Sequence, residues 1–361
     1  MSAPDRIGVA VIGAGHWGGN YVRVLGQMPN AFPAVVCDTD PARRDAVAQR
    51  FPGVPVAQDL EQALAREDVS AVVVATPATS HAELATACLA SGRHVLVEKP
   101  LTTSAGDADA LIRRADEAGL VLMVGHTFLF HPGVLKVREL VMRPALGKIH
   151  YLYSRRTNLG PIRRDVNALW DLAAHDVSIF NFMLGVIPVW VSAVGVRALD
   201  RAQVDVGFAA LGYPSGVVGH IHVSWADPSK VRELVVVASN QRIVLNDMDA
   251  QESVRIYERG VALSPTGPVG HGFGDYPLTV RDGDIISPRI EPSEPLSNQM
   301  AHFVECVQRG WTPASDGASG RNVVIVMEAI DRSVEENGAP VRVQHGEQAA
   351  VIGGIHARSV R

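Results

Sequence analysis

Short apolar runs rich in β-branched residues alternate with helical segments over the first 145 residues of the chain. The runs are IGVAVIG (7–13), AVVCD (34–38), AVVVATP (71–77), RHVLVEKP (93–100) and VLMVG (121–125). Continuous apolar strands are typical of a sheet buried on both faces, and their alternation with helices produces parallel strands covered by helices. This pattern predicts a doubly wound α/β domain over residues 1–145.

The pattern changes near Gly147, where strands with alternating side chains begin to dominate. These runs are KIHYLYSRR (148–156), VWVSAVGVRAL (189–199), QVDVGFAALGY (203–213), GVVGHIHVSW (216–225), VRELVVVAS (231–239) and QRIVLND (241–247). Several such strands separated by turn signals are typical of an antiparallel sheet with one buried face. We therefore expect an α+β domain over residues 146–343 with a large, mostly antiparallel sheet.

The remaining segments of the second half are assigned from periodicity and composition. LWDLAAHDVSIF (169–180) has helical spacing and is expected to pack on a face of the sheet. Two more helices are predicted over 296–309 and 317–336. Packing of the second of these helices on the first domain is an open alternative. Residues 260–295 are rich in Gly and Pro and are predicted to form a long loop. A mobile tail is expected over 344–361.

The first turn of the chain reads GAGHWG, a G-x-G-x-x-G pattern between a predicted strand and a predicted helix. In that setting Gly13 permits the tight turn, Gly15 lets a pyrophosphate approach the backbone, and Gly18 allows close packing of helix on strand. His16 and Trp17 complete the turn at the helix N-terminus, whose amides attract an anion. The turn therefore predicts a Rossmann domain that binds a dinucleotide.

The acidic residue that ends the second run identifies the expected dinucleotide. Asp38 lies about twenty residues after the glycine motif, where an acidic side chain binds the ribose hydroxyls of NAD. No arginine follows it directly to hold a 2′-phosphate, although Arg43 and Arg44 lie one turn into the next helix. NAD is the expected cofactor, and NADP stays open.

Two further motifs fall where strands of an open sheet end, which is where ligands bind. Thr76 and Pro77 are expected to line the cofactor cleft, although a simple strand-ending turn explains them equally well. His81 is assigned to the cofactor site, with capping or packing of the following helix as its alternative. Glu98 and Lys99 end the next strand, and Glu98 is also assigned to the cofactor. A lysine there can bind a substrate oxygen and stabilise an alkoxide, although a lone lysine is more often a surface residue.

The order and spacing of GAGHWG, ATPATSH and EKP resemble the glucose-fructose oxidoreductase/inositol dehydrogenase/rhizopine catabolism (Gfo/Idh/MocA) family. The resemblance covers nearly the whole chain, including the change to a sheet-rich second half. It implies that Lys99 is catalytic. It also implies that Asp171 and His175 are the family's D-x-x-x-H pair, which lies on a helix of the second domain.

Helical geometry agrees with that assignment. Residues four apart share a helix face, so Asp171 and His175 lie on one polar stripe. An imidazole with an ordinary pKa of about 6.5 accepts a hydroxyl proton near neutral pH, and Asp171 orients it or binds a neighbouring hydroxyl. The resemblance thus implies hydride transfer from a ring carbinol to NAD, with Lys99 stabilising the oxyanion. Asp176 lies off the stripe, and a packing or interface role competes with a functional one.

Several polar residues around the helix are candidate substrate contacts. They are Arg155, Arg156, Asn158 and Trp170, together with Lys99, Asp171 and His175. Bidentate arginines, which also include Arg163 and Arg164, suit phosphate groups, although a basic loop facing solvent or another subunit is an equal alternative. The family often has Arg or Asn after its sixth strand, whereas this chain has GHTFLFHP (125–132), so no contact can be carried over to His126, Phe128 or His131.

The substrate expected from the resemblance is a sugar or cyclitol. GHWGGNYVR and ALWDLAAHD are similar to the branch that includes UDP-N-acetylglucosamine 3-dehydrogenases. Oxidation at C3 of a nucleotide-linked sugar or aminosugar is therefore the first expectation, and an inositol or cyclitol dehydrogenase of an aminoglycoside-type pathway is the second. A non-catalytic NAD-binding sensor or scaffold is the alternative from another class, and a trans-dihydrodiol-type reductase is a further one within the fold.

Composition and charge limit the partners. A net charge of −5 over 361 residues gives no reason to expect nucleic acid or a membrane surface. Three widely spaced cysteines form neither a disulfide framework nor a metal motif, so we expect no metal and a reducing, cytoplasmic location. The apolar alternation of the second-half strands permits a homodimer or homotetramer through the sheet, as is common in the family.

Overall fold

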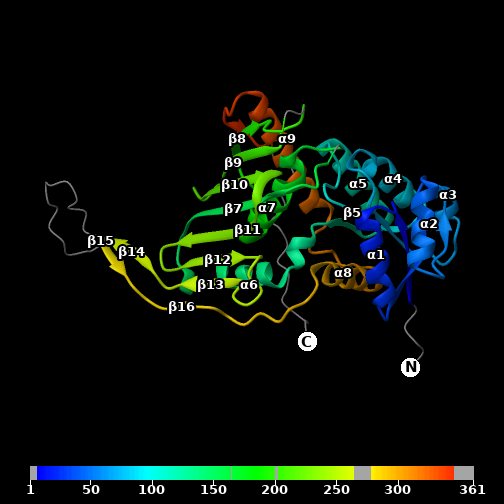
Figure 1. The fold of residues 1–361 in the computed structure, drawn as a ribbon, viewed down its shortest axis with the longest axis horizontal. Helices are drawn as coiled ribbons and strands as arrows, with labels where there is room; N and C mark the ends of the chain where they lie inside the picture. Colours follow the sequence, from blue (N-terminus) through cyan, green and yellow to red (C-terminus); the bar gives the residue numbers. More distant parts are fainter. Residues whose placement is uncertain (1–5, 164, 200–201, 264–277, 345–361) are drawn as a thin grey trace.

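The structure, a computed structural model, describes residues 6–163, 165–199, 202–263 and 278–344, and two sheets dominate it (Figure 1). The first is a six-stranded parallel sheet in the order β3-β2-β1-β4-β5-β6. Its strands are β1 (Ile7–Ile12), β2 (Ala31–Cys37), β3 (Val56–Ala57), β4 (Ala71–Val74), β5 (His94–Glu98) and β6 (Leu122–Gly125). The apolar runs therefore form the doubly wound sheet that they predict.

Helices cover both faces of this sheet. They are α1 (His16–Gln27), α2 (Pro41–Arg50), α3 (Leu60–Leu64), α4 (His81–Ala90) and α5 (Ala105–Ala118), with short turns η1 (Ala78–Ser80), η2 (Thr127–Phe130) and η3 (Pro144–Leu146). Val9 and Val11 of β1 pack into one apolar cluster with α1, while Ala10 and Ile12 pack into another with α4 and α5. Burial on both faces explains why the strands are continuously apolar.

The second sheet has nine strands in the order β16-β13-β12-β11-β7-β10-β9-β8-β17. The strands are β7 (Ile149–Leu159), β8 (Trp190–Val196), β9 (Val206–Gly212), β10 (Val218–Ser224), β11 (Ala226–Ala238), β12 (Arg242–Asn246), β13 (Val254–Tyr257), β16 (Ile285–Ile286) and β17 (Val341–Arg342). All its pairs are antiparallel except β7 with β10. The fold class predicted from the sequence is confirmed.

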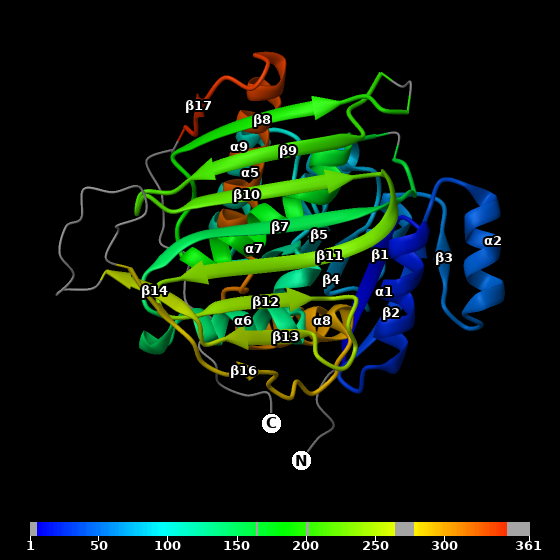
Figure 2. The same cartoon turned by 60° about the vertical axis from the view of Figure 1, so that its left-hand side comes forward.

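One face of the nine-stranded sheet carries the helices, and the opposite face, which we call the outer face, is uncovered (Figure 2). The covering helices are α6 (Pro132–Val141), α7 (Ala174–Leu184) and α9 (Gly317–Glu335). Because side chains alternate along a strand, every second residue of β7 faces α7 and its neighbours face the outer side. The side of β7 on which an arginine lies therefore determines whether it can contact α7.

The last two helices connect the two sheets. α8 (Pro295–Arg309) packs on α1, and α9 packs on α5 as well as on β8. The Ser315 hydroxyl donates to the Val124 carbonyl at 2.8 Å, and Arg321 pairs with Asp109 across α9 and α5 at 2.8 Å. The carboxyl end of β6 and helix α5 are therefore held against α9 and the residue Ser315 that precedes it.

Two local features differ from the sequence-based expectation. The helix expected over 169–180 begins with a π-turn, η4 (Leu169–Ala173), before α7. The long loop expected over 260–295 is wrong where the chain is described, because β14 (Gly260–Leu263) pairs with β15 (Leu278–Arg281) and β16 joins the large sheet. The expected tail lies, from residue 345 on, outside the described residues. No helix in the described part of the chain is long and apolar enough to cross a bilayer.

Candidate active site

The glycine turn before α1 is tightly packed at two positions and open at the third. Gly13 has φ +97°, and a Cβ there would lie 2.7 Å from the Ala75 carbonyl oxygen. A Cβ on Gly18 would lie 1.8 Å from the Gly13 carbonyl oxygen. A Cβ on Gly15 would meet no heavy atom within 4 Å, and no side chain caps the first amides of α1. The turn therefore leaves room for an anion at the helix N-terminus, beside the exposed His16 and Trp17.

Asp38 at the end of β2 anchors the same turn. Its carboxylate accepts the Ala14 amide at 2.7 Å and the Asp40 amide at 2.9 Å. The Arg43 guanidinium lies 3.5 Å from the same carboxylate. A carboxylate has about four lone-pair sites, so Asp38 retains acceptor capacity for ribose hydroxyls.

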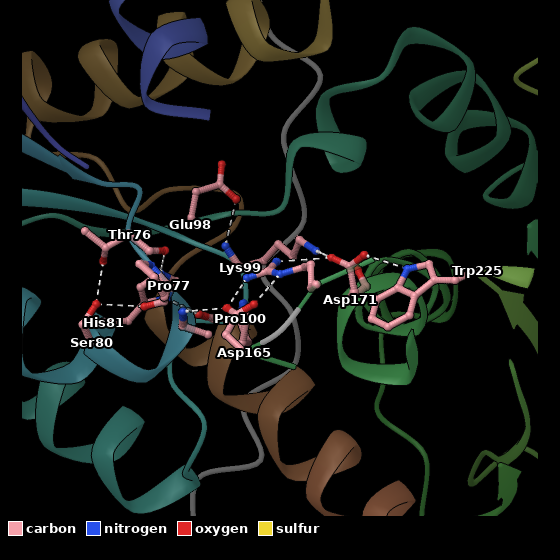
Figure 3. A network of polar contacts seen from close by, with 12 residues as sticks. Thr76, Pro77, Ser80, His81, Glu98, Lys99, Pro100, Asp165, Asp171 and Trp225 are labelled. Carbon is pink, nitrogen blue, oxygen red and sulfur yellow. Dashed lines mark hydrogen bonds and ion pairs between the residues drawn. The ribbon is translucent and has the colours of Figure 1, made fainter. Parts of the chain in front are cut away.

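His81 joins two motifs that are far apart in the sequence (Figure 3). Its Nδ1 lies 2.7 Å from the Pro100 carbonyl oxygen and its Nε2 lies 3.0 Å from the Thr76 carbonyl oxygen. The ring is 1% exposed, and burial lowers its pKa. Both ring nitrogens face backbone carbonyls, which favours the packing role given to His81 as its alternative, and its cofactor contact stays a prediction. The residue fixes the ATP motif against the EKP motif, while the Ser80 hydroxyl bonds to Thr76 and to the Pro77 carbonyl.

Glu98 is also turned away from the cleft. The Tyr21 hydroxyl of α1 donates to its carboxylate at 2.6 Å, and the Lys99 amide donates at 3.2 Å. Gln299 of α8 donates to Tyr21 at 3.0 Å, and burial raises the pKa of Glu98. The contact of Glu98 with the cofactor stays a prediction, since its carboxylate is bonded to protein groups in this structure. Its carboxylate ties β5 to α1 and α8.

Lys99 and Asp171 form a buried ion pair between the two halves of the molecule. The Lys99 ammonium donates to the Asp171 carboxylate at 2.9 Å and to the Asp171 carbonyl at 2.7 Å. The π-turn presents both oxygens, and π-turns frequently occur at functional sites. The Lys99 side chain is only 4% exposed. An ammonium has three donors, so one N–H is left for a substrate oxygen.

Two further side chains hold the Asp171 carboxylate. Arg163 lies 3.2 Å from the oxygen that Lys99 uses, and the Trp225 indole donates to the other oxygen at 3.3 Å. Burial opposes ionisation of Asp171, but Lys99 and Arg163 outweigh it and lower its pKa. Arg163 also pairs with Asp165, which accepts the Ala78 amide at 3.2 Å and so links Asp171 to the turn η1 that follows β4 (Figure 3). Sequence patterns did not identify Asp165 or Trp225.

His175 lies one helical turn from Asp171 but is not bonded to it. Its Nδ1 is buried without a hydrogen-bond partner in the part of the chain that is described. Burial lowers the pKa of His175 well below its ordinary value, and the charges of Lys99 and Arg156 lower it further. The imidazole is therefore neutral at physiological pH and can accept a proton. The expectation that Asp171 orients it does not hold, because that carboxylate is already engaged.

A second imidazole, His126, lies beside Lys99. Glu98 of β5 is in register with Gly125 of β6, so the next residues, Lys99 and His126, emerge side by side. Both ring nitrogens of His126 are buried without a partner among the described residues. Burial and then the Lys99 charge lower its pKa to about 3. No motif in the sequence identified this residue as part of the site.

The expected substrate contacts separate into two groups. Arg156 faces α7, where it forms a buried pair with Asp176 at 3.1 Å, and Asn158 lies on the same side of β7 with an unpartnered Oδ1. Arg155 is exposed on the outer face, and the Trp170 indole donates to Asp331 of α9 at 2.6 Å. Arg155 thus faces away from α7 and the Trp170 indole is bonded to α9, and the expected substrate contacts of both residues stay predictions. Arg164 lies outside the described residues, which contain no cluster of three or more potential metal ligands.

Two family models match the chain. The model described as "Oxidoreductase family, NAD-binding Rossmann fold" (GFO_IDH_MocA) matches residues 7–126, and the "GFO/IDH/MocA C-terminal domain" matches residues 134–244. The chain is 28% identical over 330 residues to UDP-N-acetylglucosamine 3-dehydrogenase of Acidithiobacillus ferrooxidans, which covers 90% of this chain and 96% of the relative. It is 26% identical over 337 residues to inositol 2-dehydrogenase of Rhizobium meliloti, with the same two coverages.

Other similarities are shorter or structural. The 4-carboxy-2-hydroxymuconate-6-semialdehyde dehydrogenase of Sphingobium sp. is 33% identical over 187 residues, which is 50% of this chain and 59% of that protein. The solved structure of GenD2 from gentamicin A biosynthesis, in complex with NAD, superposes with a TM-score of 0.79 and 28% identity. That comparison covers 96% of this chain and 98% of GenD2.

Two glycine substitutions at the first turn should affect NAD binding and folding stability separately. Gly15→Ala places its methyl group in open space, so we expect an unchanged melting temperature and at least tenfold weaker NAD binding, because the methyl group occupies the anion position. Gly18→Ala forces its methyl group into the Gly13 carbonyl and should cost about 1–3 kcal/mol of stability. Thermal unfolding and NAD titration check both. Equal effects of the two variants on both measurements would contradict this assignment.

The buried His126 makes folding sensitive to acid. Its folded pKa of about 3 lies below the unfolded value, so the unfolded chain binds the proton first and stability is lost as the pH falls below about 6.5. Between pH 6.5 and pH 5.0 this one residue should cost about 1.5 kcal/mol. Urea unfolding should show that His126→Gln loses less stability over this range than the wild type. An equal loss in both proteins would show that His126 does not carry this effect.

Proposed function

The chain belongs to the Gfo/Idh/MocA family of oxidoreductases, with an NAD-binding Rossmann domain, and we propose that it oxidises a ring secondary alcohol of a sugar or cyclitol. The observation that carries the proposal is the buried Lys99–Asp171 pair beside a neutral His175. Lys99 follows β5, at the edge at which open α/β sheets bind ligands, and Asp171 of η4 meets it there, one helical turn before His175 of α7.

The described residues fit the cofactor. The open space at Gly15 and the uncapped amides of α1 would hold the pyrophosphate, and Asp38 would accept the ribose hydroxyls. Thr76 and Pro77 follow β4 and would line the same cleft. NAD supplies the hydride acceptor, C4 of its nicotinamide ring. NADP remains a possible alternative because Arg43 lies 3.5 Å from Asp38, where a 2′-phosphate could meet its guanidinium.

The protein groups supply orientation and proton transfer. The remaining N–H of Lys99 donates to the reacting oxygen and stabilises the negative charge that develops there. His175 accepts the hydroxyl proton while the carbinol carbon loses its hydride, which leaves a ketone. Because burial lowers the pKa of His175 well below its ordinary value, the imidazole is unprotonated near neutral pH. Asp171 keeps Lys99 charged and fixed in place.

The relatives and the ion pairs of the site arginines indicate two candidate substrate classes. Oxidation at C3 of a nucleotide-linked aminosugar is supported by the similarity to a UDP-N-acetylglucosamine 3-dehydrogenase over 90% of the chain. A cyclitol is supported by the similarity to an inositol 2-dehydrogenase. It is also supported by the pairing of Arg156 and Arg163 with aspartates, which neutralises guanidiniums that would otherwise attract phosphates.

A substrate panel with active-site variants tests the function. The purified chain with NAD or NADP is mixed with UDP-sugars, inositols and aminocyclitols, and absorbance at the NADH band is followed. We expect reduction with at least one ring alcohol and a loss of kcat/KM of about a hundredfold or more in Lys99→Ala and His175→Asn. Lys136→Ala, which removes a surface ion pair on α6, is the control with unchanged rates.

Two outcomes would contradict the proposal. Absence of NADH formation with every ring alcohol, together with tight NAD binding, would favour an NAD-binding sensor or scaffold. Full turnover in either active-site variant would contradict the roles given to Lys99 and His175.

We also propose that the outer face joins two copies of the chain. It carries exposed apolar side chains on β7, β8 and β10, namely Tyr151, Val194, Val196 and Val218. The uncovered area of that sheet in Figure 2 is of the kind that protein partners cover. Light scattering should give a mass at least twice 38.6 kDa, falling toward the monomer in Val194→Lys/Val218→Lys. A monomer at micromolar concentration would contradict this.

We also propose a cytoplasmic location, with which the three buried, free cysteines agree.

A further inference from the structure

His175 is oriented without a hydrogen bond to its buried nitrogen. Nδ1 has no partner in the described chain, and Asp171 is occupied by Lys99, Arg163 and Trp225. A general base must nevertheless hold its ring in one orientation to accept a proton from a bound alcohol. Some other contact must therefore fix the imidazole.

That contact is the ring of Phe128. The centroids of Phe128 and His175 are 4.8 Å apart and their planes cross at 79°, which is an edge-to-face arrangement. Phe128 lies in η2, directly after β6, and reaches across to α7. Edge-to-face packing is a favoured geometry for two rings and restricts their rotation.

Phe128 is itself held by a cation. The Arg156 guanidinium of β7 lies over its ring at 4.3 Å from the centroid, and Arg232 of β11 lies at 5.6 Å. A desolvated guanidinium over an aromatic face attracts it through the ring quadrupole. The position of Phe128 therefore depends on where Arg156 is fixed.

Asp176 fixes Arg156. Its two carboxylate oxygens accept from Nη2 at 3.1 Å and from Nε at 3.3 Å of Arg156, and both side chains are more than nine-tenths buried. Two parallel contacts define the plane of a guanidinium as well as its distance. Asp176 follows His175 directly in the chain, yet it faces β7 and acts on the arginine.

We propose that Asp176, Arg156 and Phe128 are positioning residues that orient the His175 imidazole through one continuous set of contacts. Asp176 holds Arg156, Arg156 holds the face of Phe128, and the edge-to-face contact of Phe128 holds His175. This gives Asp176, which lies off the catalytic stripe of the helix, a defined task. The inference rests on the proposed function only for the statement that His175 is the base.

The arrangement also controls the charge state of the base. Several charged or titratable side chains surround His175 and influence its protonation. They are Lys99, His126, Arg156, Arg232, Asp171 and Asp176. Phe128 keeps water from the ring, and burial is the main cause of the lowered pKa of His175. Removal of the aromatic ring should therefore raise that pKa toward its ordinary value.

The test compares Asp176→Asn and Phe128→Leu with the wild type. We expect kcat to fall between about tenfold and a hundredfold, the KM for NAD to stay within about twofold, and the acid limb of the kcat profile to move to higher pH in Phe128→Leu. Phe128→Tyr, which keeps the ring, should restore most of the rate. Asp205→Asn is the matched control, because Asp205 is a buried aspartate that binds the backbone amides of Ala198 and Leu199.

A second measurement does not need catalysis. The ring-proton resonance of His175, identified by its loss in His175→Asn, should shift in Phe128→Leu and Asp176→Asn and return in Phe128→Tyr. The proposal would be overturned if the two variants kept the His175 resonance, the kcat and the acid limb of the wild type while their melting temperature fell as in Asp205→Asn. These residues would then have a structural role only. If the wild type reduces no NAD with any ring alcohol, the proposed function fails, and the resonance still decides whether the positioning holds.

Discussion

The site depends on the ion pair between Lys99 and Asp171. Removing an ammonium and a carboxylate from water costs several kcal/mol for each ion, and only close, well-shaped contacts offset that cost. Here the lysine bonds to two oxygens of Asp171, and the carboxylate also receives Arg163 and the Trp225 indole. A buried ion pair is weak evidence for a gain in the free energy of unfolding. The main effect of this pair is to fix a charge at the junction of the two sheets.

The pair has consequences for the groups around it. Because the Asp171 carboxylate is bound by Lys99, it neither orients His175 nor stabilises its protonated form. Burial, and then the nearby lysine charge, lowers the pKa of both His175 and His126. In the proposed function the site therefore combines a fixed cation for a developing oxyanion with a neutral base for the hydroxyl proton, the two roles that alcohol oxidation needs.

Much of this could be predicted from the sequence, because its signals are local. Apolar runs and glycine spacing determine the six-stranded sheet and its first turn within about thirty residues of chain. The four-residue spacing of Asp171 and His175 places them on one helical face whatever the rest of the fold does. Lys99, Asp171 and His175 were predicted as site residues from such signals and the family resemblance, and the structure brings Lys99 and Asp171 into contact.

The remainder depends on contacts between distant segments, which no local pattern encodes. Trp225 bonds to Asp171, and Asp165 bonds to the Ala78 amide, only once segments far apart in the sequence have packed together. The sequence does not show that His81 faces two backbone carbonyls or that Glu98 accepts from Tyr21, because these partners come from other elements. Neighbouring Arg155 and Arg156 face opposite sides of β7, and the sequence does not show which side is covered.

The most direct test of the central claim is an experimental structure of the chain with NAD bound. It should show the Lys99 ammonium within about 3 Å of Asp171, with C4 of the nicotinamide facing the gap between Lys99 and His175. A structure in which Asp171 bonds to His175 while Lys99 points to solvent would contradict the account. So would a nicotinamide ring bound away from that gap.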